Sequence, residues 1–195
     1  MNVRILITTL IFIVCSQYIV SQTKKEKEQR IKRSHFPVKA QNILNYLPKD
    51  CKRIKYYKET DGNKQSFETK FKYNRQWFSL EFSPNGRIED LEVIITIKTI
   101  NSPTKIKIEN YFNTKYLKYK LIKVQKQFVF DQNSNVEGFI TNILNHDNGT
   151  IVNYEIIAEV KTEKSREMRE FTFNQNGAFI NFRVIKPTSY EYVLY

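Results

Sequence analysis

The chain has few of the residue types from which catalytic and metal sites are commonly built. Its 195 residues include two His, two Cys and five Gly. His35 lies beside a basic tract and His146 lies in an Asn-rich segment, so each fits an exposed loop position better than the role of catalytic base. No Gly-x-Ser-x-Gly, His-Glu-x-x-His, P-loop or paired-cysteine motif occurs. We therefore expect no enzyme activity, no bound metal and no cofactor.

Cysteine is too scarce to hold the fold together. Cys15 lies in the N-terminal apolar segment, which leaves Cys51 as the only other thiol and excludes an intramolecular disulfide if that segment is removed. Cys51 has basic neighbours that could lower a thiol pKa, but a small, buried structural residue is the favoured reading. The folded part must then be held by its apolar core.

A long hydrophobic run is also missing. Residues 1–4 are short and basic, 5–14 are apolar, and 16–22 are small and polar. This layout is typical of a secretory signal, here residues 1–21, and the apolar part is shorter than the roughly 20 residues of a membrane span. We predict an exported protein, periplasmic or secreted, with no membrane span after cleavage. A lipoprotein modified at Cys15 is the less favoured alternative, because bulky residues precede that cysteine.

Acidic residues are outnumbered, with 20 Asp and Glu against 32 Lys and Arg. Six of the basic residues fall in residues 23–33, a tract without apolar periodicity, so residues 22–34 are predicted to be a basic disordered linker. Export argues against nucleic acid as the partner. An anionic envelope surface is one candidate partner, and a merely solvated basic surface is the simpler alternative.

The rest of the sequence contains a repeated pattern. Phe-x-x-Asn-Gly occurs at Phe82 and again at Phe173, each time after two alternating apolar segments and before a third. We divide the chain into a first unit at 35–100, a second at 101–187 with an insertion at 131–149, and a tail or edge strand at 188–195. Such repeats usually share a sheet or a core.

Each unit is predicted to contain one helix followed by four strands. Apolar spacing between Pro37 and Pro48 predicts the first helix, and residues 104–116 the second. Alternation between turn residues predicts the strands, at 54–58, 67–73, 78–82, 91–97, 119–130, 151–161, 168–173 and 178–185. The expected fold class is α+β, with tandem duplicated units that each pack one helix on a four-stranded antiparallel sheet. Part of the insertion, residues 139–144, can form a helical turn.

The alternation also predicts a second sheet face, exposed to solvent and charged. Phe67, Phe71 and Phe78 point to the core, so their neighbours in sequence point away from it. A charged open face with isolated aromatic residues can dock a partner, although a simply solvated face is the simpler interpretation of the pattern. The candidate partner-binding residues are Tyr57, Lys70, Lys72, Trp77, Glu81, Glu155, Ile157 and Glu159. Glu68 and Glu155 occupy equivalent repeat positions and would approach each other only if the units pack symmetrically.

One stretch has oxygen ligands at alternate positions, from Asp131 through Asn133 and Asn135 to Glu137. It lacks the glycine and the distal glutamate of a calcium loop, so an Asn-rich loop is the better interpretation.

Several segments together resemble a known group of proteins. They are Phe36-Pro37, Leu47-Pro48-Lys49, Cys51-Lys52-Arg53-Ile54, the turn at 59–62, Phe67-Glu68-Thr69-Lys70-Phe71 and Ser79-Leu80-Glu81-Phe82-Ser83-Pro84-Asn85-Gly86. Over residues 36–185 the chain looks like exported proteins of Bacteroidetes-type bacteria that are grouped with PepSY-like domains and the β-lactamase-inhibitor-protein-like fold. The resemblance implies tandem helix-plus-four-strand units and a non-catalytic binding or inhibitory role. It carries over no inhibitory residue.

These observations predict an exported, non-catalytic module that binds, inhibits or senses an extracytoplasmic protein. The alternative is a binder of anionic lipid or glycan that uses the basic linker and the sheet face. A hydrolase with an unrecognised site is the third hypothesis.

Overall fold

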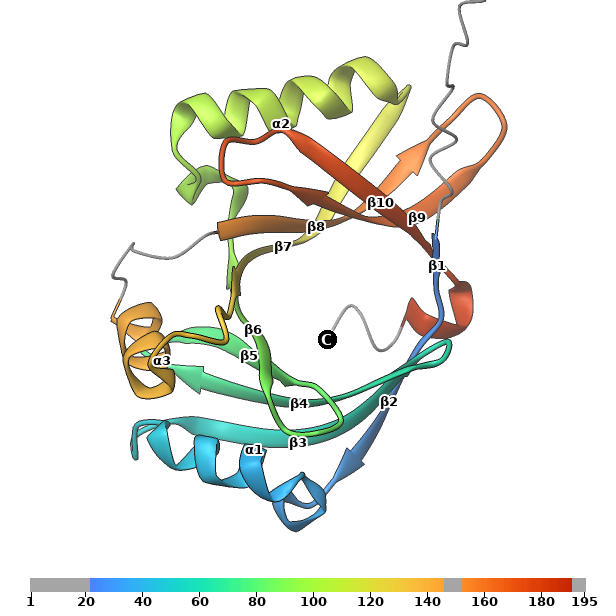
Figure 1. Ribbon diagram of the computed structural model, residues 1–195. Helices are drawn as coiled ribbons and strands as arrows, with labels where there is room; N and C mark the ends of the chain where they lie inside the picture. Colours follow the sequence, from blue (N-terminus) through green and yellow to red (C-terminus); the bar gives the residue numbers. More distant parts are fainter. Residues whose placement is uncertain (1–21, 146–151, 191–195) are drawn as a thin grey trace, which may run out of the picture.

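The computed structural model describes residues 22–145 and 152–190, and in that part of the chain ten strands form one sheet (Figure 1). The strand order is β1-β10-β9-β8-β7-β6-β5-β4-β3-β2. Neighbouring strands are antiparallel except for β1 and β10, which are parallel.

The strands are β1 (Gln22–Lys24), β2 (Glu26–Ile31), β3 (Lys52–Asp61), β4 (Lys64–Tyr73), β5 (Gln76–Phe82), β6 (Ile88–Ile95), β7 (Lys118–Val129), β8 (Val152–Lys161), β9 (Arg166–Phe173) and β10 (Phe179–Ile185). The helices are α1 (Val38–Ile43), α2 (Ser102–Lys115) and α3 (Val136–Leu144), with short 3-10 turns η1 (Arg33–His35), η2 (Leu44–Tyr46), η3 (Ile97–Thr99) and η4 (Pro187–Ser189). The predicted positions of two helices and eight strands are confirmed to within a few residues. The helical turn predicted in the insertion is longer, and forms α3.

The predicted division into two duplicated helix-on-four-strand units is wrong. Strand β6 pairs with β7 from Asp90↔Val129 to Ile95↔Val124, so the strands before and after this point belong to one continuous sheet. Unpaired strand edges are costly, and joining them satisfies their backbone groups. The alternation of apolar residues is the same whether strands share one sheet or two, and so it did not distinguish these arrangements.

The predicted disordered linker is also wrong. Strands β1 and β2 are separated only by Lys25, yet they lie at opposite ends of the strand order. Strand β1 pairs with β10 and β2 pairs with β3, so this one N-terminal segment joins both ends of the sheet and closes it on itself (Figure 1). Glu26 and Glu28 on one face of β2 are buried or half-buried, whereas Lys27 and Gln29 on the other face are exposed, so the strand is polar on both faces. A rule based on composition mistakes such a strand for a linker.

The apolar core lies outside the curled sheet, between its convex face and the helices (Figure 1). Phe71, Phe78 and Leu80 belong to a cluster with α1 and α3, while Ile156 and Phe171 belong to a second cluster with α2. Removal of these side chains from water is the main stabilising term, at roughly 25 cal/mol for each Å² of apolar surface. The packing leaves the concave face without an apolar layer.

Two glycine turns attach helices to the sheet. Gly86 and Gly177 have positive φ angles of 77° and 75°, which disfavour residues with a Cβ. A Cβ on Gly86 would lie 2.9 Å from the backbone nitrogen of Ala40 in α1, and one on Gly177 would lie 2.6 Å from the carbonyl oxygen of Thr104 in α2. The turn chemistry predicted for the two Asn-Gly sequences is thus confirmed, and each turn sits against the start of a helix.

Candidate functional site

The concave face of the sheet encloses a charged cavity, which we call the lumen. Its volume is about 260 Å³. Its lining residues are Lys24, Glu26, Glu28, Glu59, Asp61, Lys64, Ser66, Glu68, Lys70, Glu81, Asp90, Glu92, Lys123, Gln125, Gln127, Glu155, Ile157, Glu170 and Arg183. Half of the chain's 20 acidic residues are in this lining, together with five of its 32 basic residues.

A second cavity of about 500 Å³ adjoins the lumen, and we call it the mouth. Trp77, Tyr57 and Ile94 give it an apolar part, and Ile94 is 41% exposed, so the mouth opens to solvent. Six residues line both cavities and make them continuous: Glu28, Glu68, Lys70, Glu92, Lys123 and Gln125.

Six of the eight predicted partner-binding residues line these cavities. Tyr57 and Trp77 line the mouth, Lys70 lines both cavities, and the lumen also contains Glu81, Glu155 and Ile157. The alternation therefore placed these six side chains on one face of the strands, the face that lines the cavities. The expectation that this face is open to solvent is corrected, because closure of the sheet turns it inward. Glu68 and Glu155 line the same cavity from opposite halves of the chain.

The other two predicted residues lie apart from the cavities. Glu159 forms an exposed ion pair with Arg166, at 2.5 Å, and Lys72 lines neither cavity. Ile157 is buried beside Ile185 rather than forming an exposed apolar island.

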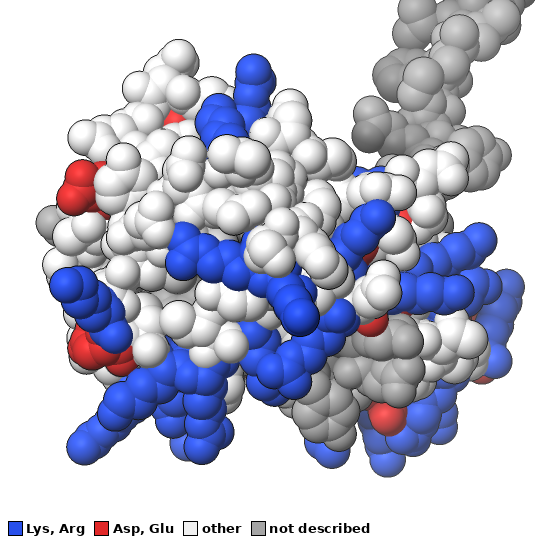
Figure 2. Space-filling model, turned by 90° about the horizontal axis from the view of Figure 1, so that it is seen from below, with Lys and Arg blue, Asp and Glu red and all other residues white. Residues whose placement is uncertain are grey.

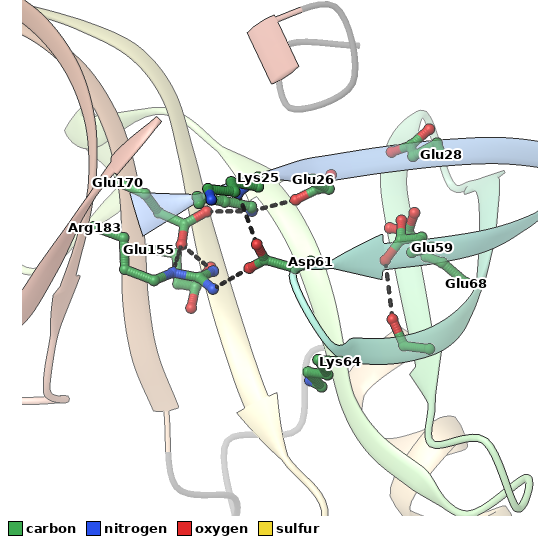
Figure 3. Close-up of polar contacts among 12 residues, drawn as sticks. Lys25, Glu26, Glu28, Glu59, Asp61, Lys64, Glu68, Glu155, Glu170 and Arg183 are labelled. Carbon is green, nitrogen blue, oxygen red and sulfur yellow. Dashed lines mark hydrogen bonds and ion pairs between the residues drawn. The ribbon is translucent and has the colours of Figure 1, made fainter. Parts of the chain in front are cut away.

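Ion pairs cross the seam where the sheet closes (Figure 3). Lys24 Nζ lies 2.6 Å from carboxylate oxygens of both Glu26 and Glu170, and Arg183 donates to Glu170 and, at 2.8 Å, to Asp61. Burial opposes the ionisation of Glu170, but Lys24 and Arg183 outweigh burial and lower its pKa to about 2. The backbone connection across the seam runs through β1, which pairs with β10 and continues into β2. The ion pairs add side-chain links from β9 and β10 to β2 and β3.

Beyond the seam, Lys70 lies between two carboxylates, 2.5 Å from Glu28 and 3.2 Å from Glu68. The Ser79 hydroxyl donates to Glu68, and Ser66 donates to Glu59 at 3.3 Å. Burial and the nearby Glu68 carboxylate raise the pKa of Glu59 well above its usual range. Burial also raises the pKa of Glu28 to about 7, against the attraction of Lys70.

Glutamine side chains hold three members of a further group of acids, while the fourth, Glu81, lies 3.4 Å from Lys64. We call Glu81, Asp90, Glu92 and Glu155 the inner acid cluster. Gln127 Nε2 donates to Asp90 at 3.1 Å and to Glu155 at 3.2 Å, and Gln125 donates to Glu92. Burial first, and then the neighbouring carboxyls, raise the pKa values of Asp90 and Glu92 well above the usual range and that of Glu155 to about 7.

Asp90 differs from the other members of this cluster in having a buried carboxylate oxygen without a hydrogen-bond donor. It is 8% exposed, and its Oδ1 atom is buried without a hydrogen-bond partner in the part of the chain that the structure describes. An unsatisfied buried polar atom is costly and rare in folded proteins.

Several lumen residues were missed in the sequence. Asp90 and Glu92 alternate with Leu91 and Val93 in a predicted strand, so the same face argument could have found them. Glu26 and Glu28 lay in the presumed linker, and Arg183 is brought to the site only by strand pairing.

The remaining sequence candidates that the structure describes, His35, Cys51 and the segment 131–137, line neither cavity. His35 is exposed, and burial, together with Asp50, raises the pKa of the half-buried Cys51 to about 11, opposite to an activated thiol. Asp131 accepts the backbone N–H of Asn133, and Asn135 caps α3 through the N–H of Gly138, so both side chains serve the local backbone. His146, Cys15, the predicted signal at 1–21 and residues 191–195 of the predicted tail lie outside the described residues.

Comparisons with known proteins give distant neighbours. No family model and no curated protein matches the chain. A proposed calcium-regulated periplasmic protein of Bacteroides thetaiotaomicron is 18% identical, with 80% of this chain and 95% of that chain covered and a TM-score of 0.30. A proposed periplasmic protein of the DUF2874 family from Bacteroides vulgatus is 19% identical, with 80% and 96% covered and a TM-score of 0.29.

Both neighbours come from Bacteroides species and are described as proposed periplasmic proteins. The PepSY-like and β-lactamase-inhibitor-like assignments are not confirmed. With TM-scores of 0.30 and 0.29, these matches support no conclusion about the ligand. Among the described residues, no helix is long and apolar enough to span a membrane.

Proposed function

We propose that the protein is an exported, non-catalytic binding protein that takes its ligand into the lumen and mouth. The observation that carries this proposal is the charged interior of the closed sheet. Small closed sheets usually fill their interior with side chains, and buried charges are a poor source of stability. A folded chain that keeps ten acids around a cavity is better explained by ligand binding than by folding. The proposed export is supported by the signal-like pattern at residues 1–21.

A binding role is favoured over hydrolysis by the contents of the cavities. The hydroxyls of Ser66 and Ser79 donate to carboxylates, and neither cavity is lined by a histidine or a cysteine among the described residues. Nucleophilic catalysis needs a nucleophile paired with a base.

Trp77 provides a direct test, because it is the single tryptophan of the chain and lines the mouth. Amines, amino acids, sugars, organic acids and fatty acids would be screened by Trp77 emission and by thermal unfolding. We expect one class to change the emission and to raise the melting temperature together, since a ligand that binds only the folded state stabilises it. Trp77→Phe provides the optical control. If no class does both, a binding role for the cavities is refuted.

A second candidate function is binding to an anionic envelope surface. With ten acids and five bases in the lumen, the rest of the chain has a formal excess of 17 positive charges. On the face on the α1 side, Lys and Arg side chains greatly outnumber acidic ones (Figure 2). The exposed residues Lys27, Lys32 and Lys39 come from β2, the following turn and α1.

The second candidate is tested with anionic and neutral vesicles. Deleting residues 23–33 would remove strands that close the sheet, so substitutions of exposed lysines are the better variants. Lys27→Glu, Lys32→Glu and Lys39→Glu together should abolish sedimentation with anionic vesicles, and wild-type binding should fall steeply with salt. The control changes Lys115, Lys118 and Lys161 to Glu, which gives the same net charge at exposed sites beside the other half of the sheet. Equal losses in both variants would contradict a specific basic face.

A further inference from the structure

The acids of the lumen differ in how they are neutralised. Glu26, Glu28, Glu68 and Glu170 each lie within ion-pair distance of a lysine or arginine. In the inner acid cluster, by contrast, Asp90, Glu92 and Glu155 accept hydrogen bonds from neutral glutamine amides. Asp90, Glu92 and Glu155 are therefore held by neutral donors, while the fourth member, Glu81, lies 3.4 Å from Lys64.

The unpartnered Oδ1 atom of Asp90 is an independent sign of a ligand at the same place. Asp90 lines the lumen and is 8% exposed, so it is more than nine-tenths buried. Its Oδ2 atom accepts a hydrogen bond from Gln127. Fixing one carboxylate oxygen with an amide while leaving the other without a donor orients an acceptor toward the cavity. A donor from a ligand would remove the cost of this buried unsatisfied oxygen.

The spacing of the acids disfavours a metal ion at this cluster. Among the described residues, Glu26, Glu28 and Glu59 are the one group of three acids whose ligand atoms lie within 4.8 Å of one another. Two members of that group are already paired with Lys24 and Lys70. Asp90, Glu92 and Glu155 form no such group, so they offer no three-carboxylate cage for one ion. An ammonium group needs only one carboxylate oxygen as its acceptor and keeps further donors for other partners.

The mouth adds an apolar wall next to these acids. Glu92 and Gln125 line both cavities, and Trp77 and Ile94 line the mouth on the solvent side. Arg53 lies over the Trp77 ring, 6.0 Å from its centroid, so the ring already contacts one cation. A ligand that reaches from the mouth to Asp90 passes from an apolar wall to carboxylates.

We propose that the lumen binds an organic amine, whose protonated amino group donates to Asp90 within the inner acid cluster and whose aliphatic chain extends past Trp77 into the mouth. This inference rests on the proposed function and specifies its ligand class. Aliphatic diamines and linear polyamines are the simplest members of that class.

Isothermal titration with 1,4-diaminobutane, 1,5-diaminopentane and spermidine tests the inference. Asp90→Asn and Glu92→Gln should each weaken binding at least tenfold, because each removes a carboxyl group that would give up its proton and become the counter-charge of the bound ammonium. Glu159→Gln is the matched control on β8, since Glu159 pairs with Arg166 outside the lumen, and it should change affinity less than twofold. Thermal unfolding of each variant verifies that it is folded.

A second readout is independent of whether the variants fold. The charged groups around Asp90 are Glu81 on β5, Glu155 on β8, Lys64 on β4 and the adjacent Glu89 on β6. Because burial and the neighbouring carboxyls raise the pKa of Asp90, binding of an ammonium group near pH 7 displaces a proton from it. Wild-type titrations in phosphate and in HEPES, neither of which contains a primary amine, should therefore give different heats, from which the number of released protons follows.

Three outcomes would overturn the inference: affinity unchanged within twofold in both lumen variants, no proton release on binding, or equal displacement of the amine by calcium or magnesium at the same concentration. If only uncharged or anionic compounds change Trp77 emission, the amine assignment fails while the proposed binding function stands. If no compound of any class binds, both fail.

Discussion

Gly177 and Gly62 have similar backbone angles but different surroundings. Both have positive φ, yet a Cβ on Gly62 would meet nothing within 4 Å, whereas one on Gly177 would lie 2.6 Å from the carbonyl oxygen of Thr104. Strain from positive φ costs about 1 kcal/mol in either position, and the backbone clash adds to it only at Gly177.

We therefore expect Gly177→Ala to lower the free energy of unfolding by about 2–4 kcal/mol and Gly62→Ala by about 1 kcal/mol. Urea denaturation measures both. Equal losses would show that α2 does not rest on this turn.

The thiol of Cys51 is the second residue with a measurable consequence. Because its pKa is raised to about 11, mainly by burial, its thiolate fraction at pH 8 is far below that of an ordinary cysteine. Iodoacetamide should modify the folded protein at least tenfold more slowly than the protein in 6 M urea. Similar rates at pH 8 would contradict this account.

At the scale of elements, the closure of the sheet depends on its N-terminal segment and on Arg183. This arginine lies on β10 and contacts Glu170 on β9 and Asp61 at the end of β3, so it joins the two ends of the strand order. Removing a partner from a buried charge pair usually costs about 3–5 kcal/mol, and here Lys24 still faces Glu170.

Arg183→Met should accordingly lower the free energy of unfolding by about 2–3 kcal/mol. Arg166→Met removes an exposed ion pair with Glu159 and should cost less than about 1 kcal/mol. Denaturant titrations at neutral pH compare the two. A loss at Arg183 no larger than that at Arg166 would mean that the seam contacts do not hold the sheet closed.

Local alternation was sufficient to locate the elements. Phe71, Phe78 and Leu80 mark the core side of β4 and β5 regardless of what the strands pair with, so the strand positions followed from the sequence. The roles of Glu26 and Glu28 did not, because a polar strand has no local signal that separates it from a linker. Only pairing with β3, and the lysines opposite, explains why this segment is ordered.

For the whole molecule, the buried acids predict an unusual dependence of stability on pH. Glu28 and Glu155 have pKa values of about 7 in the folded protein against an ordinary value of 4.5, so the folded state holds their protons more tightly than the unfolded state. Their contribution to stability is then greatest below pH 4.5 and is lost as pH rises to about 7. Glu170 acts in the opposite direction, because its pKa of about 2 gives stability that is lost as pH falls from 4.5 toward 2.

The free energy of unfolding should therefore be larger at pH 5 than at pH 8, by on the order of 2 kcal/mol. Urea denaturation at both values measures this difference. The double variant Glu28→Gln and Glu155→Gln should reduce it and should be more stable than wild type at pH 8. A wild-type protein that is more stable at pH 8 than at pH 5 would contradict the assignment of protonated acids to the lumen.

The sequence by itself determined the periodic features: the positions of the strands and helices, the two Asn-Gly turns, and the strand face that carries Lys70, Trp77 and Glu155. These depend on contacts between residues close in the chain, or on an alternation that any sheet preserves. Only the tertiary structure decided that β1 and β2 join the two ends of one sheet and turn that face inward. The reason is that strand order and closure depend on which distant backbone edges pair, and neither is encoded in the alternation. What local alternation describes as an open, solvated surface is in the folded molecule an enclosed acidic cavity.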